Sequence, residues 1–449
     1  MNYDYIYGYN KERYENLYSR KIGFKSKLKV IKVENGYLLP AKKCNNRLIG
    51  LGGVLDSSLN LVEESQIISG GAMVNFPLGE NYEVYFGGKY ELDNKKLNYL
   101  KNEVVYLGYI NNHWGHFLID FCTRLWYVSF CKPDTKYVFL VNENKNHSMI
   151  RNIKRFLELL EVPIENIEFV NTVTKCKNII IPEASYITNK YYSNEYLSIF
   201  NKVASNVNIS LMDNKKQIYF SRLGYSKAKS TEIGEELLID IFKRNGFDII
   251  SPEKCSLDEQ IALIRNSKIV AGIIGTIAHN MLFANDNQKM IIINKTFSLN
   301  TMQMDINIMK NLDITYIDSY ISLFPVSLGH GPFMIVYSKE LKKFIEDNKW
   351  NLPNENFISN SFEKKNVRIY EKRYRRLLSN KDSIIYEKNK DYSNYYNPEH
   401  LIDFYEKYYL LKKPILFYEV FFKSFSKGKF FFEKVLERIV DILKQRFHK

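Results

Sequence analysis

Between residues 216 and 294, short β-branched runs alternate regularly with amphipathic helical segments. Strands are predicted at 217–220, 247–250, 268–272 and 290–294, and helices at 232–244, 256–265 and 277–284. The second helix opens with a capping box, in which Ser256 is followed by Glu259 three residues later. An alternation of strands and helices at this spacing indicates a parallel, doubly wound α/β layer.

A similar alternation occurs earlier in the chain. Strands are expected near Val104, Val138, Phe169 and Ile180, and helices at 113–130, 147–160 and 190–205. Residues 1–95 contain β-prone segments at 28–33, 37–40 and 82–86, the first two joined by an Asn35-Gly36 turn. The predicted domains are a β-rich portion at 1–95, Rossmann-like layers at 96–205 and 216–320, and a helical, basic region at 321–449.

One polar motif lies in an otherwise apolar and aromatic stretch, at residues 112–120. His116 and Asp120 are four residues apart, so on a helix they share one face, with Arg124 one turn further along and His113 one turn before. A base, a carboxylate and a cation after a strand are typical of the catalytic edge of an α/β enzyme. The alternative is that the aromatic residues are core and the histidines satisfy local hydrogen bonds.

A second polar cluster lies in the later layer. Its members are Ser221, Arg222, Lys229, Gly275, Thr276, His279 and Asn280. Gly275 is expected where a strand turns into a helix, and such a turn directs backbone N–H groups toward an anion. Arg222 follows another strand and adds a full positive charge, so the two together predict a diphosphate pocket. Simple turn chemistry and a solvated arginine are the alternatives, because the segment matches neither the dinucleotide nor the Walker glycine pattern.

Taken in order, four motifs resemble glycosyltransferase family 61, whose bacterial members are mostly capsular polysaccharide biosynthesis proteins. They are Asn-His-Trp-Gly-His-Phe-Leu-Ile-Asp at 112–120, Ser-Arg at 221–222, Glu-Gln-Ile at 259–261 and Gly-Thr-Ile-Ala-His-Asn-Met-Leu-Phe at 275–283. The similarity covers roughly residues 52–294, since 52–56 also resembles the leading segment of the family. The resemblance implies a GT-B-like architecture of two facing Rossmann-type domains, a nucleotide-sugar donor held mainly by the later one, and inversion at the anomeric carbon.

Two departures from the family pattern concern the identity of the donor. Many relatives carry a second arginine soon after the Ser-Arg pair, where this chain has Lys227 and Lys229. The usual His-Gly-Ala of the family is here Ile274-Gly275-Thr276.

The resemblance also implies roles for the residues of both clusters. His116 or Asp120 would be the base that deprotonates the acceptor hydroxyl, the other would orient it, and His113 and Arg124 would support the acceptor side. Arg222 and the N–H groups around Gly275 would neutralise the diphosphate, assisted by the remaining members of the second cluster. Glu259 is the alternative base, although its capping-box position favours a structural role. No cofactor is expected, and a divalent metal is neither required nor excluded.

Composition adds constraints on location and partners. The formal net charge is +14, and the five cysteines are scattered without metal-ligand spacing. No secretion signal or bilayer-spanning run is expected, which predicts a cytoplasmic protein. Nucleic-acid binding is not favoured, because no recognised module accompanies the charge. The expected partners are a nucleotide-sugar donor and a glycan or lipid-linked glycan acceptor.

The C-terminal region carries most of the excess charge. Basic residues dominate 364–390, and a Phe-rich segment from 412 leads into apolar positions at helical spacing up to 447. A basic amphipathic helix of this kind is typical of attachment to an anionic membrane, here the inner face of the plasma membrane, whereas the alternative is a helical brace packed on the fold. The other functions to test are a non-catalytic, membrane-docked glycan-binding protein and another nucleotide-sugar enzyme such as an epimerase.

Overall fold

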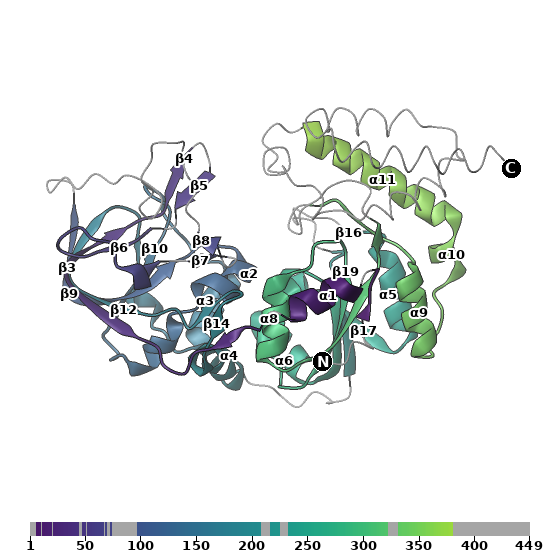
Figure 1. Cartoon of the computed structure of the whole chain (residues 1–449), viewed down its shortest axis with the longest axis horizontal. Coiled ribbons are helices and arrows are strands. Elements are labelled where there is room, and N and C mark those ends of the chain that lie inside the picture. Colours follow the sequence, from purple (N-terminus) through teal and green to yellow (C-terminus); the bar gives the residue numbers. More distant parts are fainter. Residues whose placement is uncertain are drawn as a thin grey trace.

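The structure, a computed structural model, describes residues 6–379 except 10, 20, 45–46, 51, 67, 70–71, 74–96, 208–215, 225–231 and 322–330. Figure 1 shows two α/β lobes side by side, each built around one sheet. The predicted α/β class is confirmed. The expected strand at 82–86, Lys227, Lys229 and the whole segment from 380 onward lie outside the described residues.

The first lobe is built on a six-stranded sheet in the order β11-β10-β9-β12-β3-β6. The bounds are β3 Val30–Leu39, β6 Gly53–Leu55, β9 Asn98–Tyr109, β10 Lys136–Leu140, β11 Ile167–Val170 and β12 Thr174–Pro182. The first four strands in this order run parallel, β3 pairs antiparallel with β12, and β6 pairs antiparallel with β3. In chain order the parallel strands read 3-2-1-4, so the order reverses between β9 and β12.

The second lobe contains a fully parallel sheet in the order β1-β20-β19-β18-β15-β17. The bounds are β1 Ile6–Tyr7, β15 Lys216–Phe220, β17 Phe247–Ile250, β18 Ser267–Ile273, β19 Lys289–Asn294 and β20 Asp313–Asp318. Without β1, the strands read 2-1-3-4-5 in chain order, and the order reverses between β15 and β18. Ligands of open α/β sheets bind at the carboxyl ends of the strands beside such a reversal.

Helices cover both sheets and bury the apolar faces of the strands. In the first lobe these are α3 Arg151–Leu159 and α4 Asn194–Ser205, and in the second α5 Glu235–Arg244, α6 Leu257–Arg265 and α8 Thr301–Met309. The predicted capping box of α6 is confirmed, because Ser256 and Glu259 exchange both hydrogen bonds. The central strands are buried on both faces, as a parallel sheet between helices requires.

The N-terminal residues do not form the separate unit that was predicted for 1–95. β3 and β6 belong to the first sheet, whereas β1 pairs with β20 of the second sheet. The Asn35-Gly36 turn is also wrong: both residues lie within the continuous strand β3, where Asn35 adopts a φ of 52°. A single left-handed residue inside a strand produces a local irregularity, and β12 pairs with β3 on both sides of it.

The single helix predicted at 113–130 is instead a broken path. It consists of α2 Trp114–His116, a π-helical turn η3 Phe117–Phe121 and a 3-10 segment η4 Leu125–Phe130. The helix at 277–284 likewise divides into α7 Thr276–His279 and the 3-10 segment η7 Asn280–Phe283. Both breaks occur where the two lobes contact each other, since Trp114 of α2 bonds to Asn280 of η7, and π-turns are frequently found at functional sites.

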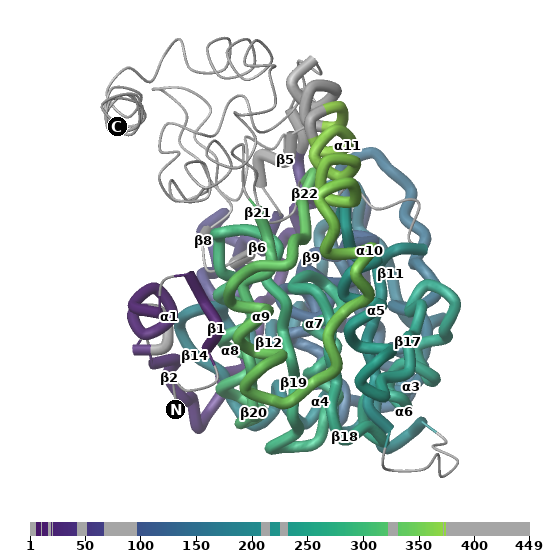
Figure 2. Tube along the Cα trace, turned by 90° about the vertical axis from the view of Figure 1, so that its right-hand side faces the viewer, coloured from purple at the N-terminus to yellow at the C-terminus, as the bar shows by residue number. Residues whose placement is uncertain are grey.

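The C-terminal part of the described chain packs on the second lobe. The small sheet β16-β22-β21 contains Glu232–Ile233, Phe333–Ile335 and Tyr320–Ile321, and helices follow as α9 Lys339–Asp347, α10 Glu355–Ile358 and α11 Asn360–Ser379. Figure 2 shows α11 rising along one side of the molecule, beyond β22. None of the helices in the described part of the chain has the length and apolar character needed to cross a bilayer.

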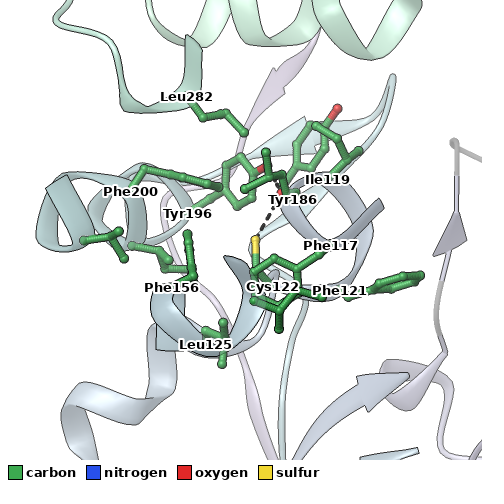
Figure 3. Packing of buried hydrophobic residues seen from close by; sticks show 14 of the residues in the cluster. Phe117, Ile119, Phe121, Cys122, Leu125, Phe156, Tyr186, Tyr196, Phe200 and Leu282 are labelled. Atoms are coloured by element: carbon green, nitrogen blue, oxygen red, sulfur yellow. Dashed lines mark hydrogen bonds between the residues drawn. The ribbon is translucent and has the colours of Figure 1, made fainter. Parts of the chain in front are cut away.

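The two lobes share a continuous apolar core. Phe156 of α3 and Phe200 of α4 pack against Phe283, at ring-centroid distances of 6.1 and 5.5 Å. Figure 3 shows Leu282 of the second lobe approaching the cluster around Tyr196 and Phe200. Buried aromatic contacts of this kind stabilise the junction, so the relative position of the two strand edges is held by the core.

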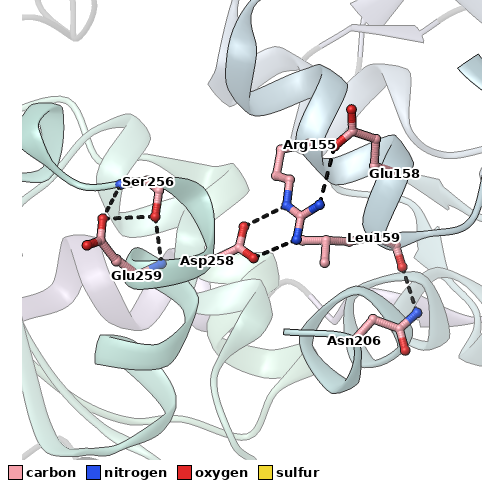
Figure 4. A network of polar contacts seen from close by, with 7 residues as sticks. All are labelled: Arg155, Glu158, Leu159, Asn206, Ser256, Asp258 and Glu259. Carbon is pink, nitrogen blue, oxygen red and sulfur yellow. Dashed lines mark hydrogen bonds and ion pairs between the residues drawn. The ribbon is translucent and has the colours of Figure 1, made fainter. Parts of the chain in front are cut away.

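Polar contacts also join the lobes at α3 and α6. Arg155 donates from Nε and Nη2 to the two carboxylate oxygens of Asp258, at 2.9 and 2.8 Å, while Nη1 contacts Glu158 at 3.3 Å (Figure 4). A bidentate pair between an arginine and a carboxylate fixes orientation as well as distance.

Candidate functional site

Contacts between the α2 and α7 segments connect the carboxyl ends of strands in the two sheets. The chain that leaves β9 enters α2, and the chain that leaves β18 enters α7, so both segments begin at a carboxyl end beside a reversal of strand order. Gly115 lies so close to the second lobe that an added Cβ would be 3.0 Å from Oγ1 of Thr276. A larger residue at 115 would therefore require the Thr276 side chain to move.

A second contact holds α2 against the second lobe. Trp114 donates from Nε1 to Oδ1 of Asn280 at 2.9 Å, and Asn280 donates from Nδ2 to Oε1 of Gln260 at 3.0 Å. Asn280 is buried. Its amide therefore joins the two lobes, and its predicted part in the diphosphate pocket stays a prediction.

His116 and Asp120 form a hydrogen-bonded pair, with Nδ1 and Oδ2 2.7 Å apart. The Asp120 side chain is fully buried, whereas the side chain of His116 is 40 % exposed. A buried carboxylate that receives Nδ1–H orients the ring and leaves Nε2 as a base, an arrangement familiar from hydrolytic triads. The predicted proximity of the two side chains is confirmed.

His113 completes the exposed side of this loop. Its Nδ1 accepts a hydrogen bond from the backbone N–H of His116 at 3.3 Å, and the two imidazole rings are 4.5 Å apart. His113 therefore caps α2 and lies beside the His116 ring. Its predicted place near the pair is confirmed, and its chemical role stays a prediction.

The predicted position of Arg124 on the same face is wrong. Arg124 is buried, and its Nη2 donates to the carbonyls of Glu64 and Gln66 at 2.7 and 2.8 Å. The guanidinium also lies 5.4 Å from the ring of Tyr106. Because the π-turn and the following turn interrupt the helix, the side chain rotates away from His116, and it anchors residues 63–66 instead.

On the second lobe, two cations share one buried carboxylate. Glu232 Oε1 contacts Nε of Arg222 at 3.0 Å and Nζ of Lys295 at 2.7 Å. Glu232 and Lys295 are each 3 % exposed at the side chain, whereas Arg222 is 16 % exposed. An added Cβ on Gly275 would be 3.6 Å from Nη1 of Arg222 and 3.9 Å from Nζ of Lys295, so the glycine backbone runs directly beside both cations.

The charges in this cluster perturb one another. Burial lowers the pKa of Lys295 to about 8, although the adjacent Glu232 opposes the effect. Burial also acts to raise the pKa of Glu232, but Lys295 and Arg222 outweigh it, so that this pKa is lowered. With both cations protonated and Glu232 ionised, the three side chains carry a net charge of +1, which suits an anionic ligand.

Glu235 is a buried carboxylate next to this cluster. Its Oε1 accepts hydrogen bonds from the backbone N–H of Arg222 at 2.7 Å and from the hydroxyl of Tyr219 at 3.1 Å. Burial raises the pKa of Glu235 to about 7, against the effect of these hydrogen bonds. Ser221 is buried in the same turn, and its Oγ accepts from the backbone N–H of Leu223 at 3.1 Å. Ser221 thus shapes the turn that presents Arg222.

His279 lies at the end of α7 and is buried. Its Nδ1 is 3.0 Å from Oε1 of Gln303. Burial lowers the pKa of His279 to about 4, and the hydrogen bond to Gln303 only partly offsets this effect. The ring is therefore neutral at physiological pH, which suits a hydrogen-bonding role better than a predicted contact with charged phosphate.

Glu259 is used at the start of α6. Its Oε2 accepts from the backbone N–H and the Oγ of Ser256, at 2.6 and 2.8 Å (Figure 4). These bonds hold the carboxylate in the capping box. Glu259 is therefore not favoured as the base, and the His116–Asp120 pair remains.

The sequence interpretation did not identify Lys295, Glu232, Glu235 or Gln303 as site residues. Lys295 directly follows the buried strand β19, just as Ser221 and Arg222 follow β15. A cation immediately after a buried strand was the available signal. In the described part of the chain, no three His, Cys, Asp or Glu side chains gather in a metal-binding arrangement.

Comparison with known proteins gives one family. The family model described as Glycosyltransferase 61 matches residues 114–291, from the start of α2 into β19. The matched range contains the His116–Asp120 pair, Arg222, Glu232, Glu235 and α7, whereas Lys295 and Gln303 lie after it. A search of curated proteins finds no match.

Proposed function

We propose that this glycosyltransferase is an inverting enzyme with a nucleotide-sugar donor. Its residues 114–291 match the family model of glycosyltransferase family 61. The acceptor in this proposal is a cell-surface glycan, of a capsule or a related polysaccharide. The observation that carries the proposal is the meeting of α2 and α7, which brings a histidine–carboxylate pair to the edge that also holds Arg222. The two parallel layers support a GT-B-like arrangement.

The first lobe supplies the base in this mechanism. The acceptor hydroxyl attacks the anomeric carbon of the donor, and His116 Nε2 takes the hydroxyl proton as the new bond forms. Asp120 holds the other ring nitrogen and stabilises the imidazolium that results. Attack from the face opposite the leaving group inverts the configuration at that carbon.

The second lobe stabilises the leaving group. As the bond between the anomeric carbon and the phosphate oxygen breaks, negative charge develops on the nucleoside diphosphate. Arg222, Gly275 and Thr276 are only partly buried, and the buried Lys295 adds charge beside Gly275. Because the protein itself supplies these cations, the proposal requires no divalent metal and no cofactor.

A panel of UDP-, GDP- and CMP-sugars, assayed with and without glycan acceptors, tests this proposal. We expect acceptor-dependent release of a nucleoside diphosphate from one UDP- or GDP-sugar, and no release in the His116→Ala variant. A new sugar nucleotide without free diphosphate would indicate an epimerase instead. Tight binding of a glycan without turnover of any donor would indicate a binding protein.

We also propose that the basic C-terminal region attaches the enzyme to an anionic membrane, at the cytoplasmic face of the plasma membrane. In α11, Lys364, Lys365, Arg368 and Lys372 are exposed, while Val367 and Tyr370 are buried. This helix therefore presents a basic outer face, which is attracted to anionic lipids.

Vesicle co-sedimentation of the full chain tests the attachment. We expect binding to anionic but not neutral vesicles, weakening with salt. A truncation that removes residues 412–449 should weaken this binding and keep transfer to a soluble acceptor, and the basic face of α11 should account for the binding that remains. Failure of the full chain to bind anionic vesicles at low salt would favour a brace.

A further inference from the structure

A chain of buried side-chain amides extends behind His279. Gln303 Nε2 donates to Oδ1 of Asn307 at 3.0 Å, and Asn307 Nδ2 donates to the hydroxyl of Tyr316 at 2.8 Å. Gln303, Asn307 and Tyr316 are 0, 1 and 3 % exposed. The chain crosses the core from α7 through α8 to β20.

The direction of these hydrogen bonds determines which nitrogen of His279 carries the proton. Because Gln303 donates through its nitrogen to Asn307, its Oε1 faces His279 as an acceptor. Nδ1 of His279 must therefore be the donor. The ring is neutral, since burial lowers its pKa to about 4, so Nε2 holds a lone pair and can only accept a hydrogen bond.

His279 lies in the segment of the second lobe that packs against the segment carrying the proposed base. Thr276 and Asn280 of the same segment contact Gly115 and Trp114, and His279 is three residues after Thr276, on the same helical face. The titratable groups that influence His279 are His116, Asp120 and His113, all from the first lobe. His279 therefore belongs to the acceptor side, although it comes from the second lobe.

Burying several amides in a core is costly unless every donor and acceptor is satisfied, and apolar residues would pack there at least as well. Here the hydrogen-bonded amides end on the imidazole of His279, so they select one tautomer of that ring. The hydrogen bond on Nδ1 determines what Nε2 can do, as it does for histidines that act as metal ligands or bases.

We propose that Nε2 of His279 accepts a hydrogen bond from the sugar hydroxyl adjacent to the attacking hydroxyl of the acceptor, and that Gln303 and Asn307 are positioning residues that hold this tautomer. The inference rests on the proposed glycosyl transfer and deepens it. It names the acceptor class: sugars with a free hydroxyl next to the one that is glycosylated. A site built to bind a hydroxyl rejects an analogue that lacks it.

NMR of the full chain labelled with ¹⁵N-histidine tests the tautomer, with the His279 signal assigned by its loss in His279→Gln. We expect the Nδ1–H tautomer without protonation down to pH 5. Methyl glycosides of glucose, galactose and xylose serve as acceptor probes, and a productive one should shift the Nε2 resonance. Removing its adjacent hydroxyl should lower kcat/KM for the acceptor by at least about 10-fold.

The Gln303→Leu variant should raise the acceptor KM about 10-fold and lose the Nδ1–H preference, with the donor KM little changed. Gln288→Leu is the matched control, because Gln288 is also a buried glutamine but bonds to Ile264 and Ser267 before β19. It should cost stability without changing the tautomer or the acceptor KM. Two variants of similar stability but different acceptor KM separate positioning from a purely structural role.

Three results would overturn the inference. They are an Nε2–H tautomer, ring protonation near pH 6.5, and turnover of a methyl glycoside that leaves the Nε2 resonance unmoved. Each of these leaves the glycosyl transfer itself intact. Absence of transfer from every donor to every acceptor would instead refute the proposed function, and the inference would fall with it.

Discussion

Both lobes carry polar residues after the carboxyl ends of their strands, but the two groups differ in how many segments supply them and in how deeply they are buried. On the first lobe, His113, His116 and Asp120 come from one short segment after β9, and the His116 side chain is 40 % exposed. On the second, Arg222, Glu232, Gly275 and Lys295 come from four separate segments, and the charges of Glu232 and Lys295 are buried.

This difference matches the two tasks of a sugar transfer. A glycan acceptor is large and continues beyond the reacting sugar, so its base has to lie on an open edge. A leaving diphosphate needs charge that is already in place, and fixed charges act most strongly where water is excluded. The contrast predicts that variants of the first lobe change turnover, whereas variants of the second change donor recognition.

The largest expected effect tests the first lobe. His116→Ala and Asp120→Asn should lower kcat by about two to four orders of magnitude, the usual result of losing a general base, and leave donor affinity nearly unchanged. Steady-state kinetics and calorimetry with the donor measure the two quantities. His147→Gln is a suitable control, because the ring of His147 packs on Phe169 of β11, the edge strand of the first sheet. Full turnover in either variant would show that another residue is the base, and His113 would be the first candidate to test.

The next effect tests the second lobe. Arg222→Ala should lower donor kcat/KM by about 10²- to 10³-fold, because a preorganised donor to the leaving group is removed, and Arg222→Lys should recover only part. Lys216→Ala provides the control, since Lys216 forms an exposed pair with Asp248 at the other end of β15. Unchanged donor affinity in Arg222→Ala, measured by calorimetry, would contradict the division of tasks.

A pH profile sharpens the same comparison. Near pH 6, Glu235 is protonated and Lys295 charged, so the cluster with Arg222 and Glu232 carries +1. As the pH rises, Glu235 loses its proton at about 7 and Lys295 at about 8, and the net charge falls to −1. Donor kcat/KM should therefore decrease by about 10-fold between pH 6 and 9.

Two substitutions identify the groups behind that decrease. Glu235→Gln cannot ionise, and Lys295→Arg stays charged, so each should flatten one part of the profile. A profile that keeps the wild-type shape in both variants would show that the buried cluster does not control donor binding.

The smallest expected effect concerns the link between the lobes. Asn280→Ala removes the bonds to Trp114 and Gln260, so the indole of the partly buried Trp114 and the amide oxygen of the buried Gln260 lose this partner. The free energy of unfolding should fall by about 2 kcal/mol, read from urea denaturation. Asn285→Ala is the control, because its amide bonds to Arg265 at an exposed position. If the Asn280 variant lost activity but no stability, Asn280 would contact substrate instead.

Local features were within reach of the sequence alone. The alternation of strands and helices, the capping box of α6 and the proximity of His116 to Asp120 all depend on residues within a few positions of one another. Hydrophobic periodicity and helical spacing depend on neighbouring residues, so they can be predicted from the sequence of one chain. Helical spacing predicted the wrong position for Arg124, because a π-turn at Phe117–Phe121 interrupts the helical period.

Tertiary structure alone decided the rest. The pairing of β1 with β20, the sharing of Glu232 by Arg222 and Lys295, and the amide chain behind His279 join segments far apart in the sequence. Such contacts arise from the register of parallel strands and from which helix ends meet, and neither leaves a periodic signal in the chain. Asn280 shows the consequence: its position on α7 was apparent from the sequence, but its partner, Trp114, lies 166 residues away.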